Sequence, residues 1–216
     1  MFGLAMIAAV AAMAFIGASS ASATVLCETT PTGTNPAICH TGWDIGANAI
    51  IKGTAVNPEL TSNLADVVCA HSETEAEITN TGGASSTVTG TIKTLKFTQC
   101  KTTVTNVPCN VTVENLPYHA EVHWITGTHD GTLTVKEHNG KGAPGATVTC
   151  ASVIECTFDS DLFDLDIDGG NPAVVTAEEV PLTNNGGAIC PSTAKWDATY
   201  KAVGTTTAIW VAKEMD

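Results

Sequence analysis

The chain has 216 residues, of which 22 are acidic and nine are lysine, with no arginine, and its formal net charge is −13. Phosphate groups are bound by basic patches and by the forked guanidinium group, so this composition argues against a nucleic-acid partner. It also disfavours docking on an anionic membrane surface. An acidic balance of this size favours a soluble protein.

The first residues predict an export signal. An apolar run over residues 4–16 is followed by GASSASA, and its last three residues, 21–23, have the small-x-small form of a leader-peptidase site. The run is shorter than the ~20 residues of a membrane-spanning helix. We therefore expect a signal peptide over residues 1–23 that is removed, no stable membrane span after cleavage, and a location that is extracellular or at the cell surface.

The remaining residues, 24–216, predict one secreted domain rich in short strands. In chain order, strands are expected over residues 49–55, 66–71, 73–79, 87–98, 109–114, 119–124, 132–136, 146–150, 155–158, 163–168, 173–182, 195–202 and 207–212, with one helical turn within 57–64. Residues 69–75 and 150–156 begin alike, which leaves open two related halves with a boundary near residue 140.

Several of these segments alternate between apolar and polar residues with a period of two, which is typical of half-buried antiparallel strands. The apolar face is expected to hold Cys109, Val111 and Val113; Ala120, Val122 and Trp124; Leu133 and Val135; Phe163, Leu165 and Ile167; and Trp196, Ala198, Tyr200 and Ala202. In the longest strand Ile92 breaks the parity of Leu95 and Phe97, which predicts a β-bulge near Lys93 and Thr94. The fold class that follows is all-β: an antiparallel β-sandwich or barrel-like domain with several disulfides.

All eight cysteines follow the expected leader, and an even number in an exported chain predicts disulfide bonds. Proximity across turns favours Cys27–Cys39, Cys100–Cys109 and Cys150–Cys156, and elimination then gives Cys69–Cys190. The alternative for Cys69 is Cys100. A zinc site made by cysteines is disfavoured, because no C-x-x-C motif occurs.

Several short segments resemble one group of proteins. They are the run from Cys109 through NLPY (115–118), GTLTV (131–135), GGNPA (169–173), GG (186–187) and CPSTAKWDATY (190–200). In these segments the chain resembles uncharacterised secreted, cysteine-containing, β-rich proteins of actinobacteria. The resemblance implies export and the style of fold, and it implies no activity.

Two groups of side chains are candidate metal ligands. His119, Glu121 and His123 lie on one face of a predicted strand, where they could bind zinc if His129 or His138 supplied a further ligand. Asp164, Asp166 and Asp168 match the opening of a calcium-binding loop, although Val175 stands where such a loop ends in glutamate. For both groups the alternative is a solvent-facing side of a strand, so the expected cofactor is none, with calcium or zinc as the alternative.

No motif for nucleophilic catalysis occurs, and cysteines held in disulfides cannot act as nucleophiles. We therefore expect a secreted, disulfide-stabilised domain without catalysis and with a structural, adhesive or surface-binding role, through self-association or an extracellular ligand. A calcium- or zinc-dependent binding module is the alternative. An extracellular hydrolase, which would need a carboxylate pair in a pocket, is the second alternative.

Overall fold

A computed structural model describes residues 23–151, 154–187 and 189–216. Apart from Ala23, the expected signal peptide lies outside the described residues. The described residues form strands and no helix, and none of them forms a helix long and apolar enough to cross a membrane. The all-β prediction is thereby confirmed.

The strands are as follows. They are β1 (Val25–Cys27), β2 (Ile38–Cys39), β3 (Ile50–Val56), β4 (Glu59–Ser62), β5 (Val67–Gly83), β6 (Ser86–Thr102), β7 (Pro108–Glu114), β8 (Tyr118–Trp124), β9 (Gly131–Lys136), β10 (Gly145–Cys150), β11 (Ile154–Asp159), β12 (Leu162–Asp168), β13 (Val174–Gly186), β14 (Thr193–Val203), β15 (Trp210–Ala212) and β16 (Glu214–Met215). The expected helical turn within 57–64 is wrong: β4 occupies that segment, because its residues pair with β14 on one side and with β5 on the other.

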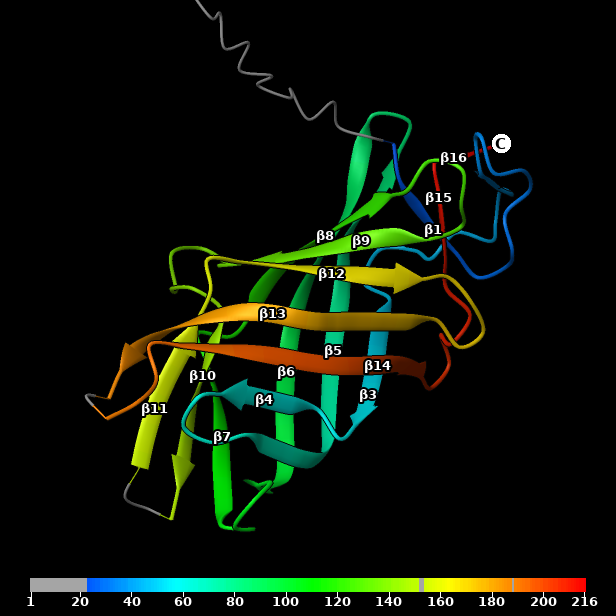
Figure 1. Cartoon of the computed structure of the whole chain (residues 1–216). Coiled ribbons are helices and arrows are strands. Elements are labelled where there is room, and N and C mark those ends of the chain that lie inside the picture. The colour runs from blue at the N-terminus through cyan, green and yellow to red at the C-terminus, as the bar shows by residue number, and fades with distance from the viewer. Residues whose placement is uncertain (1–22, 152–153, 188) are drawn as a thin grey trace, which may run out of the picture.

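Four long strands organise the molecule, and each changes its partner along its length (Figure 1). Strand β5 pairs first with β4 and then with β3, and β14 changes partner in the same order. Strand β6 pairs with β8 near its start and with β7 near its end. Strand β13 pairs with β12 near its start and with β11 near its end.

These changes of partner close the sheet into two rings that share β5, β6, β13 and β14. The upper ring, as we name it, runs β5–β6–β8–β9–β12–β13–β14–β3 and returns to β5. The lower ring runs β5–β6–β7–β10–β11–β13–β14–β4 and returns to β5. All neighbours in both rings are antiparallel, so the barrel-like alternative describes this molecule. Segments before and after residue 140 contribute to both rings.

The predicted strand faces are confirmed where they meet inside the rings. Phe163, Leu165 and Ile167 of β12 are buried, and the intervening aspartates are exposed. The predicted bulge is also present, since Glu75 pairs with Thr94 and the next residue, Ala76, pairs with Ile92. Lys93 is the extra residue.

A small cap covers the end of the upper ring that lies away from the lower ring. It consists of the antiparallel pair β1–β15 and the parallel pair β2–β16, which lie together beside the ends of β8 and β9 in Figure 1. Leu26, Ile209 and Val211 of this region pack against Val88 and Val122 of the upper ring. The upper end is therefore closed by apolar side chains.

Four disulfides join the eight cysteines: Cys27–Cys39, Cys69–Cys100, Cys109–Cys150 and Cys156–Cys190. The first is the predicted bridge, and the second is the alternative given for Cys69. The predicted bridges Cys100–Cys109, Cys150–Cys156 and Cys69–Cys190 are not formed.

The positions of the cysteines in the strands explain two of these differences. In the β10–β11 hairpin Cys150 lies opposite Ile154 and Cys156 lies opposite Val148, so these two cysteines are offset from each other. Cys69 and Cys190 are not on paired strands. Closeness along the chain is therefore a poor guide here, because Cys69–Cys100 and Cys109–Cys150 join residues that face each other on neighbouring strands.

Candidate functional site: the apolar interior

The inward face of the upper ring carries unusually small residues. Gly53, Ala76, Gly90, Ala120 and Ala202 come from five different segments of the chain and border one internal cavity. An eight-stranded closed sheet is just wide enough for large side chains to fill it or for one small ligand to fit. Because these positions lack bulk, a cavity of about 160 Å³ remains.

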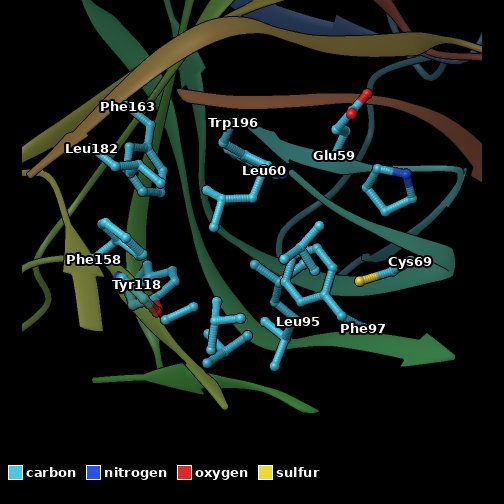
Figure 2. Close-up of a pocket in the computed structure, with 17 residues that line it drawn as sticks. Glu59, Leu60, Cys69, Leu95, Phe97, Tyr118, Phe158, Phe163, Leu182 and Trp196 are labelled. Atoms are coloured by element: carbon cyan, nitrogen blue, oxygen red, sulfur yellow. The ribbon is translucent and has the colours of Figure 1, made fainter. Parts of the chain in front are cut away.

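A second cavity of about 70 Å³ lies inside the lower ring. Leu95, Tyr118, Phe163 and Trp196 border both cavities, so these four residues form the boundary between them, which we call the waist. Figure 2 shows their side chains, with those of Leu60, Phe97 and Phe158, arranged around a common space. The two cavities are thus neighbours along one apolar interior.

The lower ring ends in a larger pocket of about 430 Å³, which we call the mouth. It shares Leu60 and Phe158 with the lower cavity and extends to the loop segments 62–66 and 103–107. Two apolar side chains of these loops face solvent, Leu64 at 53% and Val104 at 87% exposure. The interior is therefore capped at the upper end and bordered by a pocket with exposed apolar residues at the lower end.

Charge is almost absent from the interior. Among the described residues that border the two inner cavities, only Lys52 and Glu59 are ionisable at neutral pH. The Lys52 ammonium lies 3.7 Å from the Glu75 carboxylate and is largely exposed, and Figure 2 shows the Glu59 carboxylate directed away from the space. The hydrolase alternative needed a carboxylate pair in a pocket, and this single, outward carboxylate does not provide one.

The two interior tyrosines are hydrogen-bonded. The Tyr118 hydroxyl donates to the backbone oxygens of Glu114 and Gly145, and the Tyr200 hydroxyl lies 2.8 Å from Ser72 Oγ. Burial raises the pKa of Tyr118 to about 12, and the nearby Glu114 carboxylate adds to this against the effect of the hydrogen bond that the Gly145 N–H donates to the hydroxyl. Burial likewise raises the pKa of Tyr200 well above its usual value, against the effect of the Ser72 hydrogen bond. Both hydroxyls stay neutral in an apolar environment.

Trp196 differs from the tyrosines. Its indole Nε1 is buried, and among the described residues it is the one buried side-chain nitrogen or oxygen without a hydrogen-bond partner. A buried donor left unpaired costs roughly 1–3 kcal/mol. This donor belongs to the waist between the two inner cavities.

The predicted zinc ligands lie on the outer surface of the upper ring. His119 Nε2 is 2.9 Å from Glu121 Oε1, and His123 Nε2 is 3.9 Å from Glu121 Oε2. The ring of His138 stacks on His119, whereas His129 lies elsewhere, with its Nε2 2.6 Å from the Gly33 backbone oxygen. The structure thus brings His119, Glu121 and His138 together and separates His129 from them.

Glu121 is the centre of this surface group. Partial burial raises the pKa of the Glu121 carboxyl, but hydrogen bonds from His119 and Lys136 and their charges outweigh burial, so the net pKa is below its usual value. The Lys136 ammonium lies 3.0 Å from Glu121 Oε1. The group therefore has the arrangement of an ion-pair network around one carboxylate.

The predicted calcium ligands also face outward. Asp164, Asp166 and Asp168 are exposed along β12, and Asp164 accepts a hydrogen bond from Thr134 Oγ1 at 3.0 Å. Within the described part of the chain, no three or more His, Cys, Asp or Glu side chains are grouped so as to hold a metal ion. The metal-dependent alternative stays a prediction without a supporting arrangement.

The alternating sequence pattern predicted the inward faces correctly but did not predict the cavity. The signal that could have indicated it is the presence of glycine and alanine at inward positions of several strands, where larger apolar residues would fill a core. No known protein family, curated protein or solved structure matches this chain.

Proposed function

We propose that this protein binds an uncharged, predominantly apolar small molecule inside its two rings. The observation that carries the proposal is the apolar cavity of about 160 Å³, bordered by small side chains and adjoining a second cavity and the mouth. An engineered protein cavity of about 150 Å³ stays dry and binds benzene or xenon. The upper cavity is thus large enough for one ring or a short chain.

The mouth supports an entry route at the lower end. Leu64 and Val104 are exposed apolar residues at this pocket, and the cap closes the opposite end. A ligand longer than one ring would extend from the upper cavity through the waist towards the mouth. Such a protein would shield an apolar molecule from water, and its acidic surface would keep the complex soluble.

We further propose that the protein works in an oxidising compartment outside the cytoplasm. Four disulfides account for all eight cysteines, and disulfides persist mainly in exported proteins. The sequence pattern of an export signal supports the same location.

Butylbenzene is a suitable probe, because it is uncharged and combines one ring with a short chain. We expect it to bind the oxidised protein in calorimetry and to raise the unfolding temperature. At a free concentration 100-fold above its Kd, binding would add ~2.7 kcal/mol to the free energy of unfolding. This would raise the unfolding temperature by several degrees for a domain of this size.

Two variants locate the binding. Ala120→Leu adds bulk on the inward face of β8 and should abolish binding while the protein remains folded. Thr132→Leu adds a similar apolar group at an outward position of β9 and should leave binding unchanged. Absence of binding to the native protein, or equal binding by both variants, would overturn the proposal and leave a structural or adhesive role as the function to test.

A further inference from the structure

Trp196 lies at the boundary between the two inner cavities. The residue lies on β14, opposite Leu60 of β4 and Val180 of β13. Its ring packs against two aromatic rings of the interior, with centroid distances of 5.6 Å to Phe163 and 6.2 Å to Tyr200. Figure 2 shows Trp196 beside Leu60 at the border of the lower cavity.

The indole N–H is a donor and cannot accept a hydrogen bond. The phenolic hydroxyls of Tyr118 and Tyr200 have partners within the protein, and Trp196 Nε1 has none among the described residues. A phenylalanine would also place an aromatic ring here, without an unpaired donor. The N–H is therefore a polar group that packing alone does not explain.

Trp196 also lies beside the space that a bound molecule would occupy. It borders both inner cavities, so a molecule that occupies the upper cavity and reaches the lower one runs alongside the indole ring. Protein atoms enclose Nε1, so an acceptor reaches it only when bordering side chains move aside to admit the ligand. A buried donor of this kind favours a molecule with an acceptor over an analogue that lacks one.

We propose that the ligand carries one uncharged hydrogen-bond acceptor, a carbonyl or ether oxygen, which accepts a hydrogen bond from Trp196 Nε1 at the waist, with apolar groups on either side. This rests on the proposed function. A carboxylate does not fit, because the described residues that border the two inner cavities offer no free cation to balance it: the Lys52 ammonium is paired with Glu75 and largely exposed. The selected class is a neutral ketone, ester or ether with an apolar skeleton.

The test compares butylbenzene with butyrophenone, which has the same carbon skeleton and a carbonyl in place of the first methylene of the chain. Each Kd is measured by calorimetry for the native protein and for Trp196→Phe. We expect the substitution to weaken butyrophenone binding about 3- to 10-fold, as for loss of one hydrogen bond, and to change butylbenzene binding much less. An equal change for both compounds would overturn the inference but leave the proposed function standing.

A second measurement does not depend on the variant being folded. In protein labelled with ¹⁵N-tryptophan, butyrophenone should move the Trp196 indole N–H proton resonance downfield, and butylbenzene should not. If both compounds bind and the indole proton has the same chemical shift in the two complexes, the acceptor does not meet Nε1 and the inference is wrong. If neither compound binds the native protein, the proposed function itself fails.

Discussion

Cys100 and Cys109 lie directly opposite each other on β6 and β7, yet each is bonded to a different cysteine. Cys69 faces Cys100 from β5, and Cys150 faces Cys109 from β10. Four cysteines therefore form one row across four neighbouring strands, with bridges between the first and second and between the third and fourth.

This row predicts an alternative bridge. When Cys69 and Cys150 are both replaced by serine, the two remaining thiols stay opposite each other, so we expect a Cys100–Cys109 disulfide to form under oxidising conditions. Peptide mapping by mass spectrometry without reduction would identify it. The protein should lose stability, since each native bridge is worth ~4 kcal/mol in the loop-entropy model. As a control, Cys156→Ser with Cys190→Ser should preserve the native bridges of the row. Free thiols at Cys100 and Cys109 would contradict the prediction.

The buried hydroxyl pair of Ser72 and Tyr200 should show strong energetic coupling. Tyr200→Phe or Ser72→Ala leaves one buried hydroxyl without its partner at 2.8 Å, and we expect each to lower the free energy of unfolding by ~1–3 kcal/mol. The double variant should cost clearly less than the two single losses added together. Denaturant titration of all four proteins measures this coupling, and strict additivity would show that the hydrogen bond contributes nothing.

The Glu121 network predicts a pH-dependent stability. The pKa of Glu121 is lowered in the folded protein because the hydrogen bonds and charges of His119 and Lys136 outweigh burial. A lowered folded-state pKa gives stability that is present above the unfolded-state pKa and is lost as the pH falls through the folded-state value. Glu121→Gln should therefore be less stable than the native protein near pH 6, and this deficit should shrink in acid below the ordinary glutamate pKa.

Chemical denaturation at several pH values measures the deficit. Glu137→Gln is the matched control, since it removes the same charge at an exposed position just after β9, outside the Glu121 network. A deficit for Glu121→Gln that stays constant from pH 6 into acid would show that the carboxylate charge is not responsible.

Substitution of Gly82 by alanine should lower the stability of the protein more than the same substitution at a comparable glycine. It has φ +78°, and an added Cβ would collide with the backbone oxygen of Thr24, which accepts a hydrogen bond from the Gly83 N–H. Gly204 has φ +94° and open space around the same position. Both alanine variants incur the left-handed penalty of roughly 1–2 kcal/mol, and Gly82→Ala should cost at least about 1 kcal/mol more because of crowding. Equal Tm values for the two variants would contradict this.

Alternation along the chain was sufficient to predict which side chains point inward. Phe163, Leu165 and Ile167 are examples, and Ile92 correctly indicated the bulge at Lys93. These predictions succeed because side-chain direction in a strand depends on local geometry with a period of two. The resulting all-β class follows from the same pattern.

The pairing of strands could not be predicted in this way. Nothing local shows that β5 and β14 exchange β4 for β3 along their length, because that depends on the closure of the whole sheet. The bridge from Cys109 to Cys150 was missed for the same reason. The cavity depends on which inward residues meet across the ring, such as Gly90 beside Ala120, and therefore became visible only in three dimensions.

The sharing of β5, β6, β13 and β14 between the two rings has a consequence for unfolding. Unfolding of either ring as a whole removes half of the strands of the other, since each ring contains eight strands and four are common to both. Two cavities therefore do not make two independent folding units. Denaturation should give a single cooperative transition in which probes of either ring report the same midpoint, and a ligand held in the upper ring should protect backbone amides of the lower ring from hydrogen exchange.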